Sequence, residues 1–184
     1  LHISTWPKAF VYRLDENGTW AAQGRPDEEL ETMGMMMYNG KLYVGTLPSA
    51  RVFRHDDDAV WRPVGASLDE SDNKYRRAWS MALYHGSLFC GVLPSGRVFR
   101  LNAGSNITHD HSLKPGWRHL CITRQPNRIA LYVDGKPVAA RDMEGEAPIN
   151  IANTNPLRIG AGEGDYFNGW MRDVRLYDCA LAED

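Results

Sequence analysis

Short apolar runs separated by turn residues recur along the first hundred residues and predict β-strands. Residues 35–38 and 79–84 are apolar, and each run ends in a turn dipeptide, Asn39-Gly40 or His85-Gly86. Apolar strands around such a dipeptide form hairpins, because both turn positions need a positive φ. Further strands are expected over residues 42–46, 51–54 and 61–64. The pattern therefore predicts units of four antiparallel strands.

One such unit is repeated. Residues 42–54 (LYVGTLPSARVFR) and 88–100 (LFCGVLPSGRVFR) are identical at nine of thirteen positions, and residues 1–13 align with both. The second interval between units is longer because residues 69–78 insert about five extra residues. Four strands in 41–46 residues is the size of one β-propeller blade. The equivalent prolines lie 41 and then 46 residues apart, at Pro7, Pro48 and Pro94.

Residues 15–20 (DENGTW) resemble the Asp-box of sialidase-type β-propellers, and residues 56–61 are a degraded copy. In such a turn the Asp side chain accepts hydrogen bonds from backbone N–H groups, and the Trp fills the gap between strands. The resemblance implies a fold and no catalysis, because in that family the box lies far from the active site. A propeller closes with about four to eight blades, whereas residues 1–103 hold about two and a half. Either more blades precede them, or another part of the chain covers the open edge.

The pattern changes after Gly104. Alternating strands are expected over residues 120–124, 128–133 and 171–177. Four segments resemble the C-terminal half of a laminin G-like (concanavalin A-like) jelly-roll domain: GWRHL (116–120), LYVDGKPVA (131–139), LRIGAG (157–162) and YFNGWMRDVRLYDCAL (166–181). The first half of that domain is either supplied by the repeats or lies elsewhere. The expected fold is all-β, with propeller-like four-stranded antiparallel repeats over residues 1–103 and a jelly-roll sandwich segment over residues 104–184.

Composition narrows the class of protein. The net charge of −2 argues against nucleic-acid binding through a basic surface. No apolar stretch approaches the roughly 18 residues of a membrane span, and no signal peptide is visible. The chain begins at Leu1 without an initiator Met, so we expect a processed piece of an extracellular or periplasmic protein. Cys90, Cys121 and Cys179 are too few for a disulfide scaffold; pairing of the last two stays open beside a role as buried apolar residues.

The loops at one end of the repeats are the expected ligand-binding face. Propeller ligands usually bind opposite the Asp-box turns, as the fold resemblance implies. The inserted linker carries Tyr75, Arg76 and Arg77 and is followed by Trp79; Trp6 lies in the first turn at the same end. Aromatic rings stack on sugars, and guanidinium groups pair with carboxylates. The alternative is that Trp79 packs in the blade and that the arginines are solvated. The loops concerned are residues 6–8, 47–50 and 93–96 and the linkers 24–31 and 65–78.

Metal and catalytic chemistry are less well supported. Glu163 and Asp165 could bind Ca²⁺ with backbone carbonyls, as the laminin G resemblance allows, although such a site needs about six oxygens. No nucleophile elbow, Walker loop or zinc-protease motif occurs. The acidic run around Asp69, Glu70 and Asp72 is interpreted as a solvated loop. Catalysis by this chain alone is therefore not expected.

Three functions remain in view. The leading one is an extracellular carbohydrate-binding (lectin-like) module that recognises a glycan or a glycosylated surface. The alternatives are a fragment of a glycan-processing enzyme, either a sialidase-like glycoside hydrolase or a polysaccharide lyase, and a protein-interaction or adhesion module. Exposed sheet edges also predict self-association.

Overall fold

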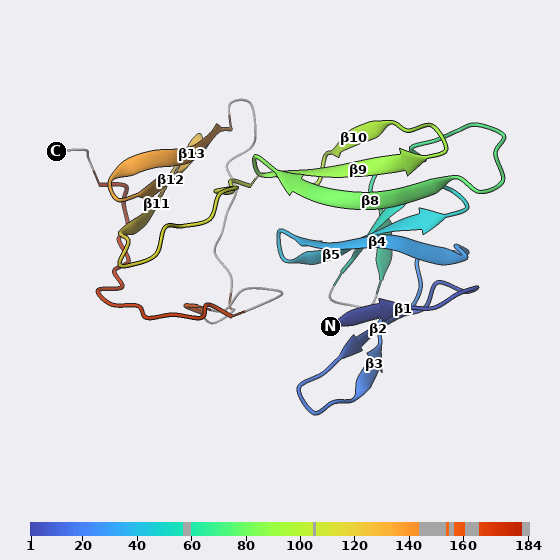
Figure 1. Ribbon diagram of the computed structural model, residues 1–184, viewed down its shortest axis with the longest axis horizontal. Coiled ribbons are helices and arrows are strands. Elements are labelled where there is room, and N and C mark those ends of the chain that lie inside the picture. The colour runs from blue at the N-terminus through green and yellow to red at the C-terminus, as the bar shows by residue number, and fades with distance from the viewer. Residues whose placement is uncertain (57–59, 105, 144–153, 155–156, 161–165, 182–184) are drawn as a thin grey trace. The chain divides into compact units, whose positions relative to one another are not determined.

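The computed structural model describes the chain except for residues 57–59, 105, 144–153, 155–156, 161–165 and 182–184. Its described residues form thirteen β-strands and no helix, so the chain is all-β, as the sequence predicts (Figure 1). The strands make four antiparallel sheets. The chain divides into two units, residues 1–104 with three sheets and residues 105–184 with one.

Each repeat in residues 1–104 forms its own sheet, and we call these the first, second and third sheets. Among the described residues only the second has the predicted four strands. Within the described residues, the first sheet has no counterpart of the strand over residues 31–38, and the third has none of the strand over residues 61–63. The first sheet contains β1 (His2–Ser4), β2 (Val11–Leu14) and β3 (Trp20–Ala22). The second contains β4 (Glu31–Tyr38), β5 (Lys41–Leu47), β6 (Val52–His55) and β7 (Trp61–Pro63). The third contains β8 (Arg77–Tyr84), β9 (Ser87–Leu93) and β10 (Val98–Leu101).

The turns confirm that the repeat in sequence is a repeat in backbone conformation. The predicted hairpin turns have positive φ at both positions, 48° and 79° for Asn39-Gly40 and 45° and 67° for His85-Gly86. A second set of positive φ values, 50°, 51° and 69°, occurs two residues after each repeated proline. These residues are Ala9, Ala50 and Gly96.

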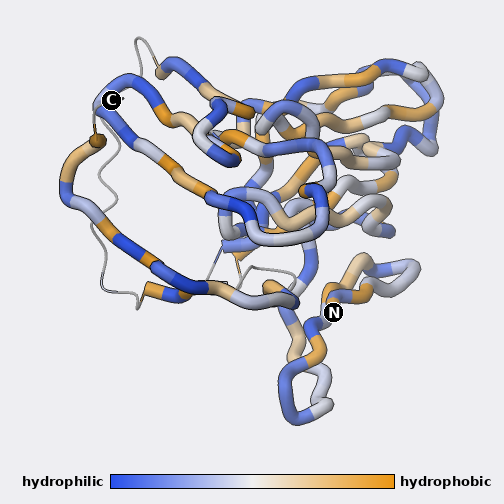
Figure 2. Tube along the Cα trace, turned by 60° about the vertical axis from the view of Figure 1, so that its left-hand side comes forward, coloured by the Kyte–Doolittle hydropathy of each residue, from blue (hydrophilic) through white to orange (hydrophobic). Residues whose placement is uncertain are grey.

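The second sheet is buried on both faces. We call the face of each sheet that looks toward the next repeat its front, and the other face its back. Alternate side chains of a strand point to opposite faces, and β5 is buried at consecutive positions, Leu42 to Leu47, on both of its faces. Figure 2 shows hydrophobic and hydrophilic residues interspersed along the chain. The front of the second sheet packs on the back of the third through a cluster that includes Tyr38, Val52, Leu88 and Cys90. Its back packs on the first sheet through Val11, Leu42, Val44 and Phe53.

Strands β5 and β8 approach closely where the second and third sheets meet. A Cβ atom at Gly45 would lie 2.1 Å from the carbonyl oxygen of Ala78. At Gly34 a Cβ atom would lie 3.1 Å from the Cα atom of Ser80. The backbones come this close because neither glycine has a side chain.

The Asp15 turn forms the local hydrogen bonds that the sequence predicts. The Asp15 carboxylate accepts bonds from the backbone N–H groups of Asn17 (2.9 Å) and Thr19 (2.7 Å). The tryptophans differ from expectation. Trp61 bridges two sheets, because its indole N–H donates to the carbonyl of Gln23 at 2.8 Å, whereas Trp20 is 42% exposed.

Residues 105–184 contain a three-stranded meander of β11 (Leu120–Gln125), β12 (Arg128–Val133) and β13 (Lys136–Asp142). Asp134 opens the predicted turn and accepts a hydrogen bond from the backbone N–H of His119 at 3.0 Å. The prediction of a strand over residues 171–177 is wrong: the segment is described and is not in a sheet. Its alternation satisfies strand propensity, but a strand also needs a hydrogen-bonded partner, and Leu176 remains 84% exposed. All three cysteines are free, so Cys121 and Cys179 are not paired.

Candidate functional site

The linkers and turns of residues 1–104 gather at one end of the sheets, as predicted. The backbone N–H of Ala9 donates to the carbonyl of Leu30 at 3.1 Å. In the next repeat, the N–H of Leu68 donates to the carbonyl of Ala50 at 2.9 Å. The hydroxyl of Ser67 also donates to the carbonyl of Ser49 at 2.6 Å. Each linker is thus held against a Leu-Pro-Ser turn or its equivalent.

A buried carboxylate marks each of these junctions. Glu29 is 5% exposed and accepts hydrogen bonds from the backbone N–H and the hydroxyl of Ser49. Asp69 is 8% exposed, which corrects its interpretation as solvated, and accepts a bond from the backbone N–H of Ser71 at 2.9 Å. Hydrogen bonds from Ser71, helped by the hydroxyl of Ser95, lower the pKa of Asp69. Ser95 occupies the repeat position of Ser49, so both junctions place a serine beside a buried carboxylate.

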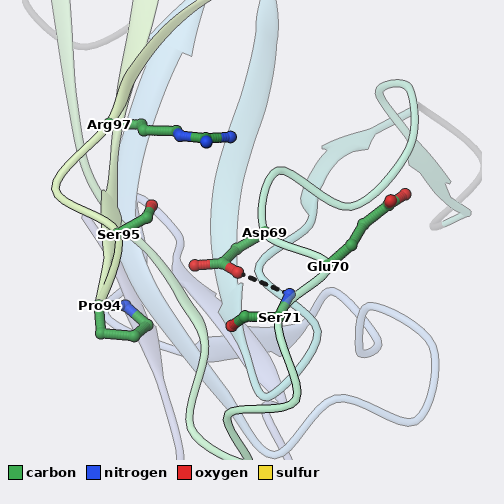
Figure 3. Close-up of a pocket in the computed structure, with 6 residues that line it drawn as sticks. All are labelled: Asp69, Glu70, Ser71, Pro94, Ser95 and Arg97. Atoms are coloured by element: carbon green, nitrogen blue, oxygen red, sulfur yellow. Dashed lines mark hydrogen bonds between the residues drawn. The ribbon is translucent and has the colours of Figure 1, made fainter.

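The second junction differs because it opens into a pocket of about 370 Å³. One wall is the inserted linker, and the other is the turn after β9 (Figure 3). Arg97 extends across the space beside Asp69, whereas the Glu70 side chain points away from it. Oδ2 of Asp69 is buried and has no hydrogen-bond partner among the described residues. The pocket is lined by Asp69, Glu70, Ser71, Pro94, Ser95 and Arg97.

The pocket therefore combines a free acceptor, a cation and hydroxyls within one opening. A buried polar atom without a partner is costly, so it favours a ligand that supplies the missing donor. Arg97 makes no ion pair or side-chain hydrogen bond within the described part of the chain, which leaves its donors available to an acceptor. This arrangement suits a neutral ligand rich in hydroxyl groups.

The sequence-predicted residues of the linker fall into two groups. Tyr75 is 50% exposed, and the Arg77 guanidinium lies 6.0 Å from the centre of its ring. Arg77 also donates to the carbonyl of Tyr75 at 3.2 Å. Arg76 instead holds the linker together, because it donates to the carbonyl of Asp69 at 3.0 Å and forms a backbone bridge with Ser49. Tyr75 and Arg77 are thus accessible to a ligand, whereas Arg76 positions Asp69.

The two predicted tryptophans lie outside the pocket lining. Trp79 is 50% exposed on β8, so it is not packed in the core, contrary to the alternative considered from the sequence. Trp6 is 68% exposed in the first turn. The sequence did not single out Asp69, Ser95 or Arg97 as binding residues. The signal that could have done so is the repeat itself, because Ser95 matches Ser49 and the insertion falls beside it.

The predicted Ca²⁺ ligands Glu163 and Asp165 lie outside the described residues. Within the residues that the structure describes, no three His, Cys, Asp or Glu side chains are grouped as metal ligands. No helix in the described part of the chain is long and apolar enough to cross a membrane.

Comparison with known proteins relates most of the chain to one family. The family model of the concanavalin A-like lectin/glucanases superfamily, of laminin G type, matches residues 58–184. The match begins before β7 and thus takes in the third sheet and the pocket. A curated relative, "Adhesion G-protein coupled receptor V1" of Danio rerio, is 35% identical over 88 residues, which is 42% of this chain. The matched region spans 1% of that receptor's length. No solved structure matches the chain significantly.

Proposed function

This chain belongs to the concanavalin A-like lectin/glucanases superfamily, and we propose that it is an extracellular carbohydrate-binding module. The observation that carries the proposal is the pocket between the inserted linker and the turn after β9. A sugar hydroxyl can donate to the free Oδ2 of Asp69, and a sugar oxygen can accept from Arg97. The exposed ring of Tyr75, on the same linker, offers an apolar surface for stacking.

The pKa of Asp69 argues against a role as the general acid of a glycosidase. A glycosidase needs a general acid, whose pKa is raised so that the carboxyl stays protonated at working pH. Hydrogen bonds from Ser71 shift the pKa of Asp69 in the opposite direction. Asp69 therefore stays ionised at neutral pH and can accept a hydrogen bond from a ligand, so we keep the lectin as the leading function.

A protein-interaction or adhesion module is the second candidate. It is favoured by the relative that is named as an adhesion receptor. The two functions differ in what they recognise on a surface. Binding that survives removal of glycans from that surface would favour adhesion through protein contacts.

A glycan array probed with the full chain tests the proposal. We expect selective binding that falls about tenfold in Arg97→Ala and in Tyr75→Ala, because each loses a direct contact worth about 1–1.5 kcal/mol. Arg13→Ala is the matched control, since Arg13 is exposed on β2 of the first sheet. Loss of binding in a chelator would assign recognition to Glu163 and Asp165 instead. Equal binding by all three variants would refute the pocket as the site.

A further inference from the structure

One valine position shows that the three sheets are equivalent in sequence but not in burial. The front of each sheet carries a valine at the same point of the repeat, and these are Val11, Val52 and Val98. Val11 is 0% exposed and Val52 is 1% exposed, because each lies between two sheets. Val98 is 70% exposed. The front of the third sheet thus has the sequence of a covered face, but within the described part of residues 1–104 no further sheet packs on it.

Other front positions behave in the same way. Tyr84 matches Tyr38, and the exposed fraction rises from 3% for Tyr38 to 58% for Tyr84. Leu93 matches Leu47, and the exposed fraction rises from 4% to 37%. In the second sheet the covered face is also satisfied chemically, because the Tyr38 hydroxyl donates to the carbonyl of Gly86 at 2.8 Å. An apolar face of this kind marks an interaction surface.

The back of the first sheet is the complementary case. Ile3 takes the repeat position of Val44 and Cys90, which are both 0% exposed, yet Ile3 is 41% exposed. Trp20 takes the position of Trp61, which lies against the first sheet and bonds Gln23. Trp20 is 42% exposed. These apolar back positions are exposed in the first sheet, and the apolar front positions are exposed in the third.

We propose that the front of the third sheet binds the back of the first sheet in a second copy of this chain, with the reciprocal contact closing a dimer. The argument rests on continuity with the interfaces inside the chain. Two such interfaces exist inside the chain, and in each the front of one sheet packs on the back of the next. The residue types on these faces match those on the exposed front of the third sheet and the exposed back of the first. Two copies bring together six sheets, which is within the four to eight that close a ring of stacked sheets. The two front-to-back contacts of such a dimer together cover both exposed faces of each copy.

Sedimentation velocity of the full chain over a range of concentrations is the first test. The expected result is a reversible monomer–dimer equilibrium. Val98→Asp and Ile3→Asp should each raise the dimer dissociation constant by about tenfold or more, because each places a carboxylate in a dry interface. Val98→Ser removes apolar contact with a smaller change and should weaken the dimer in the same direction. Val60→Asp is the matched control, since Val60 is 40% exposed in the turn between β6 and β7.

Mixing experiments separate front-to-back from front-to-front association. In an equimolar mixture of Val98→Asp and Ile3→Asp chains, the heterodimer has one front-to-back contact that carries neither substitution. In a mixture of wild type with the Val98→Asp/Ile3→Asp double variant, the heterodimer carries the same two substitutions. Each of its two front-to-back contacts then contains one of them. The proposal predicts heterodimers in the first mixture and few in the second. Equal behaviour of the two mixtures, a monomer at every concentration, or a dimer indifferent to both substitutions would each overturn it.

Discussion

Replacing Gly45 with alanine should destabilise the contact between the second and third sheets. The added Cβ would lie 2.1 Å from the carbonyl oxygen of Ala78 and 2.9 Å from its carbonyl carbon. Both atoms are backbone, so neither can rotate away. Ordinary contact begins at 3.4 Å, so β5 and β8 must separate by about 1.3 Å (3.4 − 2.1). That separation loosens the packing of Tyr43 and Val52 against Leu88 and Cys90.

The cost of this change can be estimated from its physical parts. Overpacking a dense core costs typically about 1–3 kcal/mol, and more when backbone must move. The lower entropy of the unfolded alanine chain returns about 0.4–1 kcal/mol. Because both contacted atoms are backbone, we take the upper end of that cost, about 3 kcal/mol, and expect a net loss of about 2–2.6 kcal/mol for residues 1–104. Domains of this size are stable by only about 5–15 kcal/mol, and a loss of 1 kcal/mol lowers Tm by about 4–8 °C.

Gly91→Ala provides a control at the equivalent position of the third sheet. Its Cβ would meet only the hydroxyl oxygen of Ser80 at 3.0 Å, and that hydroxyl can rotate. We expect a change in unfolding free energy within about 1 kcal/mol of zero. Urea denaturation of the full chain measures both variants, and hydrogen–deuterium exchange of peptides from β5 and β8 reads the affected contact directly. Equal stability of Gly45→Ala and wild type, or equal damage from Gly91→Ala, would refute the close-approach argument.

Two further predictions concern titratable groups. Hydrogen bonds from Ser71 hold the pKa of Asp69 below its ordinary value of 3.8. Ionised Asp69 therefore stabilises the fold above pH 3.8, and this stabilisation is lost as the pH falls through the pKa of the folded state. In urea titrations at several pH values, Asp69→Asn should lose less stability in acid than the wild type, and an unchanged acid profile would contradict this. Burial raises the pKa of the Cys90 thiol to about 11. At pH 8, iodoacetamide should therefore modify exposed Cys179 well before Cys90. Peptide mass spectrometry measures the labelling of each cysteine, and equal labelling of the two would contradict the prediction.

Local features of the fold followed from the sequence alone. The hairpins at Asn39-Gly40 and His85-Gly86 were predictable because a turn with two positive φ values restricts the residues that can form it. The Asp15 turn was predictable for the same kind of reason, since its hydrogen bonds join residues at most four positions apart. The repeat was visible as direct identity between residues 42–54 and 88–100. The family resemblance over residues 104–184 was also readable, and the matched region, residues 58–184, includes that segment but begins within the residues assigned to the repeats.

Whatever depends on a partner from another part of the chain was decided only by the tertiary structure. The alternating residues 171–177 have the pattern of a strand but no paired strand among the residues that the structure describes. Asp69 looked like part of a solvated acidic run, and its burial follows from the fold around it. Val52 and Val98 share one sequence context, yet one is covered and the other is exposed. Sequence patterns record what each residue can do locally, whereas burial depends on which surfaces meet, and that is determined by long-range packing.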